Sequence, residues 1–382
     1  MKNAQLNSAR ESDQDDIIQI AGAGPSGLAA AITLAKSGYR VQVHEAKECV
    51  GFRFKRDLQG LENWTTRQDV LAWLDDYGIS TDFRKYACHQ GTGFDYKRRA
   101  YEFNSEQPLF YLVERGPREG SLDHALLCQA QDLGVEVKFN SRLRTLEGKG
   151  ILATGPRGAD AIAVGFHFET DMENGFWFIC DDDLAPQGYS YLLVMNGVAT
   201  IKTCMFSGFK QEKKYVERTV RAFEELLDIK MINPQSHGGA GNFMLVSNAI
   251  HGRHPVVGEQ AGFQDTLWGF GMRHAITSGV LAAQSLINGS DYNELWKQAF
   301  AEQIKTSIVN RGLFTLLGNR GYSFFMRKLS ASSNTRAALY RHYHSMWIKK
   351  LLYPWANRRY KNKRGDQSCH QADCSCVVCR CG

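Results

Sequence analysis

The most constraining feature of this sequence is a glycine-rich turn near its start. An apolar run at residues 17–20 leads into Gly22-x-Gly24-x-x-Gly27, and an alanine-rich segment follows at once. Strand, glycine turn and helix in this order are typical of a dinucleotide-binding site. The first glycine permits the tight turn, the second lets a pyrophosphate approach the backbone, and the third lets helix and strand pack closely.

A second strand and an acidic residue complete this predicted site. The strand is expected at residues 39–44, and Glu45 stands at its end. An acid about 20 residues after the glycines can hold both ribose hydroxyls. The free N–H groups of the turn and the positive end of the helix dipole would face the phosphates. The predicted binding residues of the turn are Gly22, Ala23, Gly24, Pro25, Ser26 and Gly27.

A second glycine site lies far along the chain. An apolar strand ends in Gly258-Glu259, and Gly269-Phe270-Gly271 opens an alanine-rich helix that runs to about residue 286. A strand that ends in a glycine and an acid, followed by a glycine turn and a helix, predicts another ligand site. We assign Gly258, Glu259, Gly269 and Gly271 to it.

The two glycine sites together resemble those of FAD-dependent oxidoreductases with the glutathione-reductase-type fold. Within that class, residues 17–286 look most like the geranylgeranyl reductase family, which is related to the aromatic-ring hydroxylases. The resemblance implies that FAD is the cofactor and that Glu259, where the family usually has Asp, contacts the ribityl chain. It also implies that Arg53 approaches the pyrophosphate and the flavin; a solvated surface arginine is the alternative.

The resemblance extends to the substrate cavity. Geranylgeranyl reductases carry a Pro-x-x-Tyr-x-Trp-x-Phe-Pro motif beside the flavin, and residues 186–194 keep its first proline, its tyrosine as Tyr189 and an aromatic residue as Tyr191. A related cavity is implied, with Tyr189 and Tyr191 as the candidate catalytic residues or as its wall. The alternative is an ordinary core strand with two tyrosines.

The activity that the resemblance implies is hydride transfer between flavin N5 and an apolar, isoprenoid- or lipid-like substrate, by a reductase or dehydrogenase. NAD(P)H is a candidate electron donor. The Asp-Gly pair usual in aromatic hydroxylases is absent after Ala153-Thr154-Gly155, which disfavours the alternative of a flavin monooxygenase. An FAD-containing redox-sensing or partner-binding protein is the other alternative. We expect no nucleic-acid partner.

The predicted fold class is α/β, with a Rossmann-like FAD-binding domain, an inserted β-rich substrate domain and a helical, basic C-terminal segment. The FAD-binding domain is expected at 17–85, 115–162 and 245–290, and the insertion at 86–114 and 163–244. A polar leader (1–16), the helical segment (291–365) and a cysteine-rich tail (366–382) complete the chain.

Charge is distributed unevenly along this chain of net charge +6. Between Gln303 and Arg364 there are fourteen lysines and arginines and no acidic residue. Such a segment favours an anionic partner surface. In residues 336–352, Tyr340, Tyr343, Trp347 and Leu351 recur at helical spacing, which predicts one amphipathic helix lying on an anionic membrane. Packing of this helix against the acidic body is the alternative.

Since no signal peptide or membrane-spanning run is present, we expect a cytoplasmic protein that can associate with a membrane.

The ten cysteines fall into two groups. Five are scattered through the body and are expected to be reduced core thiols. The other five lie in the last fourteen residues. Their spacing predicts a zinc site, because four closely spaced thiolates suffice for tetrahedral Zn²⁺. Its ligands would be Cys374, Cys376, Cys379 and Cys381. A copper or metallothionein-like loop, acylation, and a tail of free thiols remain as alternatives.

Overall fold

The first glycine turn lies at the edge of a four-stranded parallel sheet. The computed structural model describes residues 17–361, apart from 144, 147, 157, 244–245 and 345–346. The sheet has the order β8-β2-β1-β9, and each pairing is parallel. Its strands are β1 (Ile18–Ala21), β2 (Val41–His44), β8 (Glu136–Lys138) and β9 (Gly150–Leu152). The carboxyl ends of parallel strands meet at one edge, so the turn after β1 and Glu45 after β2 lie side by side.

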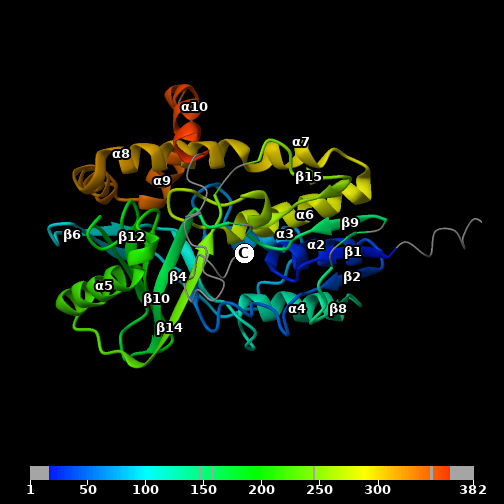
Figure 1. The fold of residues 1–382 in the computed structure, drawn as a ribbon, viewed down its shortest axis with the longest axis horizontal. Coiled ribbons are helices and arrows are strands. Elements are labelled where there is room, and N and C mark those ends of the chain that lie inside the picture. Colours follow the sequence, from blue (N-terminus) through cyan, green and yellow to red (C-terminus); the bar gives the residue numbers. More distant parts are fainter. Residues whose placement is uncertain are drawn as a thin grey trace, which may run out of the picture.

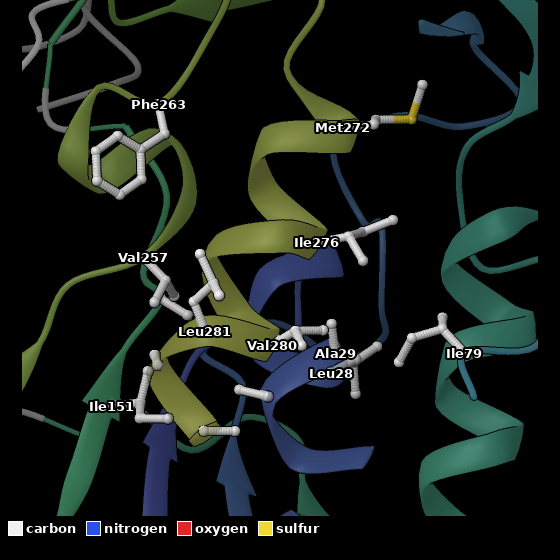
Figure 2. Packing of buried hydrophobic residues seen from close by; sticks show 14 of the residues in the cluster. Leu28, Ala29, Ile79, Ile151, Val257, Phe263, Met272, Ile276, Val280 and Leu281 are labelled. Atoms are coloured by element: carbon white, nitrogen blue, oxygen red, sulfur yellow. The ribbon is translucent and has the colours of Figure 1, made fainter. Parts of the chain in front are cut away.

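Two helices from distant parts of the chain pack on this sheet. They are α2 (Pro25–Lys36) and α6 (Met272–Asn288). Figure 2 shows Leu28 and Ala29 of α2 in one cluster with Ile276 and Val280 of α6, and all four side chains are buried. Gly279 permits the close approach, because a Cβ there would lie 2.1 Å from the carbonyl oxygen of Ser26.

A larger sheet of seven strands forms the second layer, on the left in Figure 1. Its order is β14-β10-β13-β12-β11-β5-β6. The strands are β5 (Gln90–Asp95), β6 (Ala100–Asn104), β10 (Ala161–Glu169), β11 (Gly175–Cys180), β12 (Tyr189–Met195), β13 (Val198–Met205) and β14 (Ile232–Gly241).

The two faces of this sheet have different partners, because side chains alternate along a strand. Ala199 and Ile201 of β13 point to one face and join a buried cluster with Phe223 of α5 (Glu212–Leu227). Thr200 and Lys202 point to the other face. There Thr200 accepts a hydrogen bond from Leu58 N (3.0 Å), which lies in the part of the chain that follows the nucleotide-binding unit. The second face therefore lies against the segment that begins at Leu58.

A three-stranded antiparallel sheet connects the two layers. It has the order β3-β7-β4, with β3 (Leu58–Glu62), β4 (Lys85–Cys88) and β7 (Phe110–Glu114). Helix α3 (Val70–Asp76) lies between β3 and β4 in the sequence, and α4 (Leu122–Asp132) follows β7. Ser121 is the N-cap of α4: its Oγ accepts a hydrogen bond from His124 N at 3.2 Å. A short hairpin of β15 (Ile250–His251) and β16 (His254–Pro255) leads back to the second glycine site.

The C-terminal part of the described chain is helical, as expected. It consists of α7 (Tyr292–Trp296), a π-helical turn (Lys297–Ala301), α8 (Glu302–Ser330), α9 (Thr335–Tyr343) and α10 (Trp347–Lys361). Helix α8 is interrupted at Gly318, whose backbone (φ 56°, ψ −154°) is accessible almost only to glycine. Helices α8 and α9 lie along the top of the molecule in Figure 1, and α10 projects beyond them.

The prediction of one amphipathic helix over residues 336–352 is wrong. Helix α9 ends at Tyr343, and His344 already has an extended backbone (φ −83°, ψ 121°). The reason is tertiary: Tyr343 is 1% exposed, and its hydroxyl donates to Asp265 Oδ1 at 2.9 Å. Its side chain therefore faces the core, whereas Trp347 and Leu351 on α10 are exposed.

Other expectations have mixed outcomes. Three body cysteines (Cys88, Cys180 and Cys204) are buried free thiols, while Cys49 and Cys128 are partly exposed. The leader and the cysteine-rich tail, with the four predicted zinc ligands, lie outside the described residues. Within residues 17–361, gaps aside, we find no helix with the length and apolar character needed to cross a membrane.

We predict that Gly279→Ala destabilises the protein by about 1–3 kcal/mol, a typical effect of overpacking, even though alanine favours helix. Its Cβ would meet the Ser26 carbonyl in a tightly packed interface. The measurement is urea unfolding followed by circular dichroism. Gly158→Ala is the control, because a Cβ at Gly158 meets no atom within 4 Å and should change stability by less than about 0.5 kcal/mol. Equal stability of the two variants would contradict the packing argument.

Candidate functional site

The first glycine turn contains glycines with two different roles. Gly22 has a φ of +110°, and a Cβ there would lie 2.2 Å from the Ala153 carbonyl oxygen. A Cβ at Gly27 would lie 2.0 Å from the Gly22 carbonyl oxygen. These two glycines are thus required by packing. A Cβ at Gly24, in contrast, would meet nothing within 4 Å, so the space beside Gly24 is open.

This open space lies at the start of α2, where an anion is favoured. Gly24 is the N-cap residue and Pro25 the first helical residue, and no side chain caps the helix. The first N–H groups of an uncapped helix remain available to a ligand, and the dipole there favours negative charge. An open backbone cradle at a helix N-terminus fits the pyrophosphate of FAD.

Glu45 reaches the same turn from β2. Its Oε2 accepts a hydrogen bond from Ala23 N (2.9 Å), and its Oε1 accepts one from Lys47 N (3.0 Å). The carboxylate is therefore held beside the first glycine turn, as the sequence predicts. Its role as a ribose ligand stays a prediction.

The second glycine site faces the first across the α2–α6 interface. Gly258 has a φ of +63°, and a Cβ there would lie 2.7 Å from Ser26 Oγ of the first turn. Glu259 Oε2 forms an ion pair with Arg53 Nη2 at 3.0 Å. The structure thus brings together Arg53 and Glu259, which the sequence assigns to separate motifs and which are 206 positions apart. Arg53 is half exposed, so this pair orients the two side chains more than it stabilises the fold.

Gly269 and Gly271 shape the turn before α6. Gly269 has a φ of +76°, and its carbonyl accepts a hydrogen bond from Gln264 Nε2 at 2.7 Å. Gly271 is the N-cap of α6, and again no side chain caps the helix. Both α2 and α6 therefore begin at glycine turns without a side-chain cap.

The two candidate catalytic tyrosines lie beside the second glycine turn. Tyr189 is buried and its hydroxyl donates to the Trp268 carbonyl, next to Gly269. The ring of Tyr191 is 5.9 Å from that of Tyr189. Burial raises the pKa of both hydroxyls well above the ordinary tyrosine value. Both tyrosines are therefore neutral at pH 7, and Tyr189 has its proton engaged by a carbonyl, which favours a wall role.

Tyr189 belongs to a larger group of aromatic side chains, here called the aromatic cluster. Its rings come from the small sheet and the segment after β3, the large sheet, the second glycine turn, α8 and α9. The Trp64 and Phe270 rings are only 4.7 Å apart. The cluster comprises Trp64, Phe110, Phe176, Phe178, Tyr189, Trp268, Phe270, Phe314 and Tyr343. The sequence motif indicated Tyr189 alone, because the other rings come from segments that only the fold brings together.

Arg311 of α8 fixes the turn beneath this cluster. It is fully buried and donates to the carbonyls of Thr266 (2.9 Å), Gln187 (2.6 Å) and Leu267. Its guanidinium also stacks on Phe206 at 3.7 Å from the ring centroid. Arg311 belongs to the basic segment between Gln303 and Arg364, but its buried guanidinium is not available to an anionic partner surface. The same holds for Arg336, which is 9% exposed and donates to Asn63 O at 2.5 Å.

Sequence reasoning also missed a buried charge cluster on the inner face of the large sheet. Lys202 Nζ lies 2.6 Å from Asp57 Oδ1, and His237 Nδ1 lies 3.8 Å from the same oxygen. Burial alone raises the pKa of Asp57, but Lys202 and His237 more than offset this and hold the pKa below its usual value. Burial, followed by the nearby Lys202 charge, lowers the pKa of His237. Such a pair is invisible in the sequence, because 145 positions separate its two members.

Among the residues that the structure describes, no group of three or more His, Cys, Asp or Glu side chains could hold a metal ion.

The comparisons with known proteins agree with this geometry. A family model for an NAD(P)-binding Rossmann-like domain matches residues 20–63. A digeranylgeranylglycerophospholipid reductase of Haloferax volcanii is 23% identical over 377 residues, which cover 83% of this chain and 90% of that protein.

Solved structures show the same fold. A geranylgeranyl bacteriochlorophyll reductase-like protein from Thermoplasma acidophilum has a TM-score of 0.69 at 17% identity, and the match covers 90% of this chain and 98% of that one. A myxobacterial chondrochloren halogenase, an FAD-dependent enzyme, has a TM-score of 0.57 at 13% identity, with 90% and 96% covered. The predicted α/β fold with a Rossmann-like FAD-binding domain and the resemblance to geranylgeranyl reductases are thereby confirmed.

We predict that Gly24→Val folds like the wild type but loses FAD. The branched side chain has room in the folded protein and would occupy the position of the pyrophosphate. The measurements are the thermal unfolding midpoint and the FAD content after purification. A folded variant that retains its full yellow colour would contradict the placement of the cofactor.

Proposed function

We propose that this protein is an FAD-dependent reductase that acts on an apolar, isoprenoid- or lipid-like substrate. The observation that carries the proposal is the position of the aromatic cluster, which adjoins the second glycine turn at Tyr189 and Trp268. The similarity to a curated digeranylgeranylglycerophospholipid reductase supports the reductase over the halogenases and monooxygenases that share the fold. NAD(P)H as electron donor and Zn²⁺ in the cysteine-rich tail are further parts of the proposal.

The residues of the chain have separate tasks in this proposal. Bound FAD supplies hydride transfer. The two helix N-termini and Glu45 hold its charged part, and Arg53 and Glu259 orient each other beside it. The aromatic cluster excludes water and offers apolar contacts to a substrate. Arg311 holds residues 266–268 in place, so the turn that carries Gly269 keeps its position relative to Tyr189.

The test is an anaerobic turnover assay with the FAD-loaded protein, dithionite as reductant and a digeranylgeranylglycerol phospholipid as probe. We expect mass spectrometry to show hydrogen added across isoprenoid double bonds, because hydride transfer from flavin needs no oxygen. Gly24→Val, which is predicted to lack FAD, is the control. A product that contains oxygen and forms only in air would instead indicate a monooxygenase.

We also propose that the protein docks on an anionic membrane surface. Seven of the eleven exposed large apolar side chains of the described residues lie on α8 and α10, and this set is here called the outer patch. The patch comprises Leu316, Leu317, Phe324, Trp347, Ile348, Leu351 and Trp355. Both helices lie at the top of Figure 1, and α10 projects from the body. An exposed apolar patch of this kind marks an interaction surface.

Charge supports a lipid partner. The segment that carries the outer patch has no acidic residue, and Arg320, Lys328 and Arg358 lie among the apolar residues. The opposite side of α8 contributes Phe314 and Tyr322 to the apolar core. Helix α8 thus contributes residues both to the aromatic cluster and to the outer patch, which supports a lipid substrate and a membrane surface as partners of the same region.

We predict that the double variant Trp347→Ser, Leu351→Ser binds anionic vesicles at least about tenfold more weakly than the wild type, since each exposed side chain would bury apolar area in the headgroup region. Both side chains are 69% exposed, so folding should be unaffected. Vesicle sedimentation at low and high salt is the measurement, and Leu133→Ser on the other side of the molecule is the control. Binding that depends on neither anionic lipid nor salt would contradict the proposal.

A further inference from the structure

A surface groove lies between the loop that follows β2 and the edge of the seven-stranded sheet. Its volume is about 350 Å³. The loop contributes Phe52, Lys55 and Arg56, the segment after β7 contributes Arg118, and the sheet contributes His167 and Gln235. None of these residues belongs to the two glycine turns, so the groove is separate from the predicted FAD site.

Two polar groups of the groove lack partners among the residues that the structure describes. His167 is 7% exposed; its Nε2 contacts Gln235 Oε1 at 3.2 Å, but its Nδ1 has no hydrogen-bond partner. Arg56 Nε is buried and also has none. Because a buried polar atom without a partner costs free energy, a polar ligand that formed a hydrogen bond with either atom would stabilise this site.

The groove also gathers positive charge that nothing in the described chain neutralises by close contact. Lys55 and Arg56 form no ion pair there, and Arg118 reaches Glu114 only at 4.0 Å. Glu48 and Glu169 line the groove as well, yet the cations outnumber them. Asp57, next in sequence, is already engaged by Lys202 at 2.6 Å.

The backbone that presents these cations is strained. Lys55 (φ 39°) and Arg56 (φ 74°) are consecutive non-glycine residues in the left-handed region. A hydrogen bond from Arg56 N to the Arg115 carbonyl (3.1 Å) helps to hold them. Strain of this kind is concentrated at ligand-binding and active sites.

The same loop connects the groove to the predicted flavin site. The His167 and His237 rings are 6.0 Å apart, and His237 Nε2 contacts the Arg53 carbonyl at 2.6 Å. Arg53 in turn forms the ion pair with Glu259 of the second glycine turn. A ligand in the groove would therefore lie on one side of this loop, with the predicted flavin contacts on the other.

We propose that this groove binds a phosphate group of a ligand that takes part in the reductase reaction. A phosphate has enough acceptor oxygens to meet Lys55, Arg56 and Arg118 together, and arginine suits it through its fork of donors. Phe52, which is exposed at the groove, can cover an adjoining apolar or aromatic moiety. Two sources share this chemistry: a nicotinamide nucleotide that donates electrons, and the headgroup of a phospholipid substrate. The link to the reaction rests on the proposed function.

The test measures binding of three probes to the FAD-loaded full-length chain by isothermal titration calorimetry: inorganic pyrophosphate, NADPH and a short-chain glycerophospholipid. We expect Arg56→Gln to weaken binding about tenfold, the typical effect of losing one charge-assisted hydrogen bond, and Lys55→Gln to weaken it less. Lys213→Gln on α5, an exposed cation that does not line the groove, is the control and should bind like the wild type.

The results distinguish a nicotinamide nucleotide from a phospholipid headgroup as the ligand. They also distinguish a failure of the groove proposal from a failure of the proposed function. If NADPH binds more tightly than both pyrophosphate and the lipid, the groove is a site for the electron donor. If the lipid binds more tightly than the other two probes, the groove is a site for the phospholipid headgroup. The proposal is overturned if no probe binds, or if Arg56→Gln and Lys55→Gln behave like Lys213→Gln. FAD content is measured on the same samples, and protein that holds FAD but binds no probe refutes the groove while leaving the flavin site intact.

Discussion

The close contact between α2 and α6 is the constraint on which the rest of the structure depends. Gly279 permits it, because a Cβ there would lie 2.1 Å from the carbonyl oxygen of Ser26 in α2. The contact sets the first turn of α2 against the middle of α6, and both helices begin at glycine turns without a side-chain cap. One elongated anionic cofactor can then interact with both, although the two helices come from distant parts of the chain.

The seven-stranded sheet forms the second layer, and its inner face carries the aromatic and charged side chains near this contact. The large sheet turns its inner face toward the nucleotide-binding unit, with aromatic side chains on β11 and β12 and a buried charge cluster around Lys202 on β13. Arg311 of α8 ties the second glycine turn to the segment that leads into β12. The inner face of the large sheet is thus apolar near Tyr189 and polar near Asp57. The groove lies beyond its polar part.

Local patterns in the sequence predict much of this fold. The glycine spacing of the first turn and the position of Glu45 each depend on a short stretch of sequence, and the structure has them where they are expected. The wrong predictions concern residues whose burial is set by contacts with distant segments of the chain. Tyr343 and Arg336 look like surface residues of a basic helix, but Asp265 and the Asn63 carbonyl draw them into the core. The Asp57–Lys202 pair and the groove are likewise products of tertiary contact alone.

The most direct test of this account is whether both glycine turns hold the same FAD. The measurement is the dissociation constant for FAD of the wild type, Glu45→Gln and Glu259→Gln, obtained by titration of the apoprotein. The account predicts that each single variant binds FAD about tenfold more weakly, since each loses a hydrogen bond to a charged group. An unchanged affinity in either variant would show that its turn does not contact the cofactor.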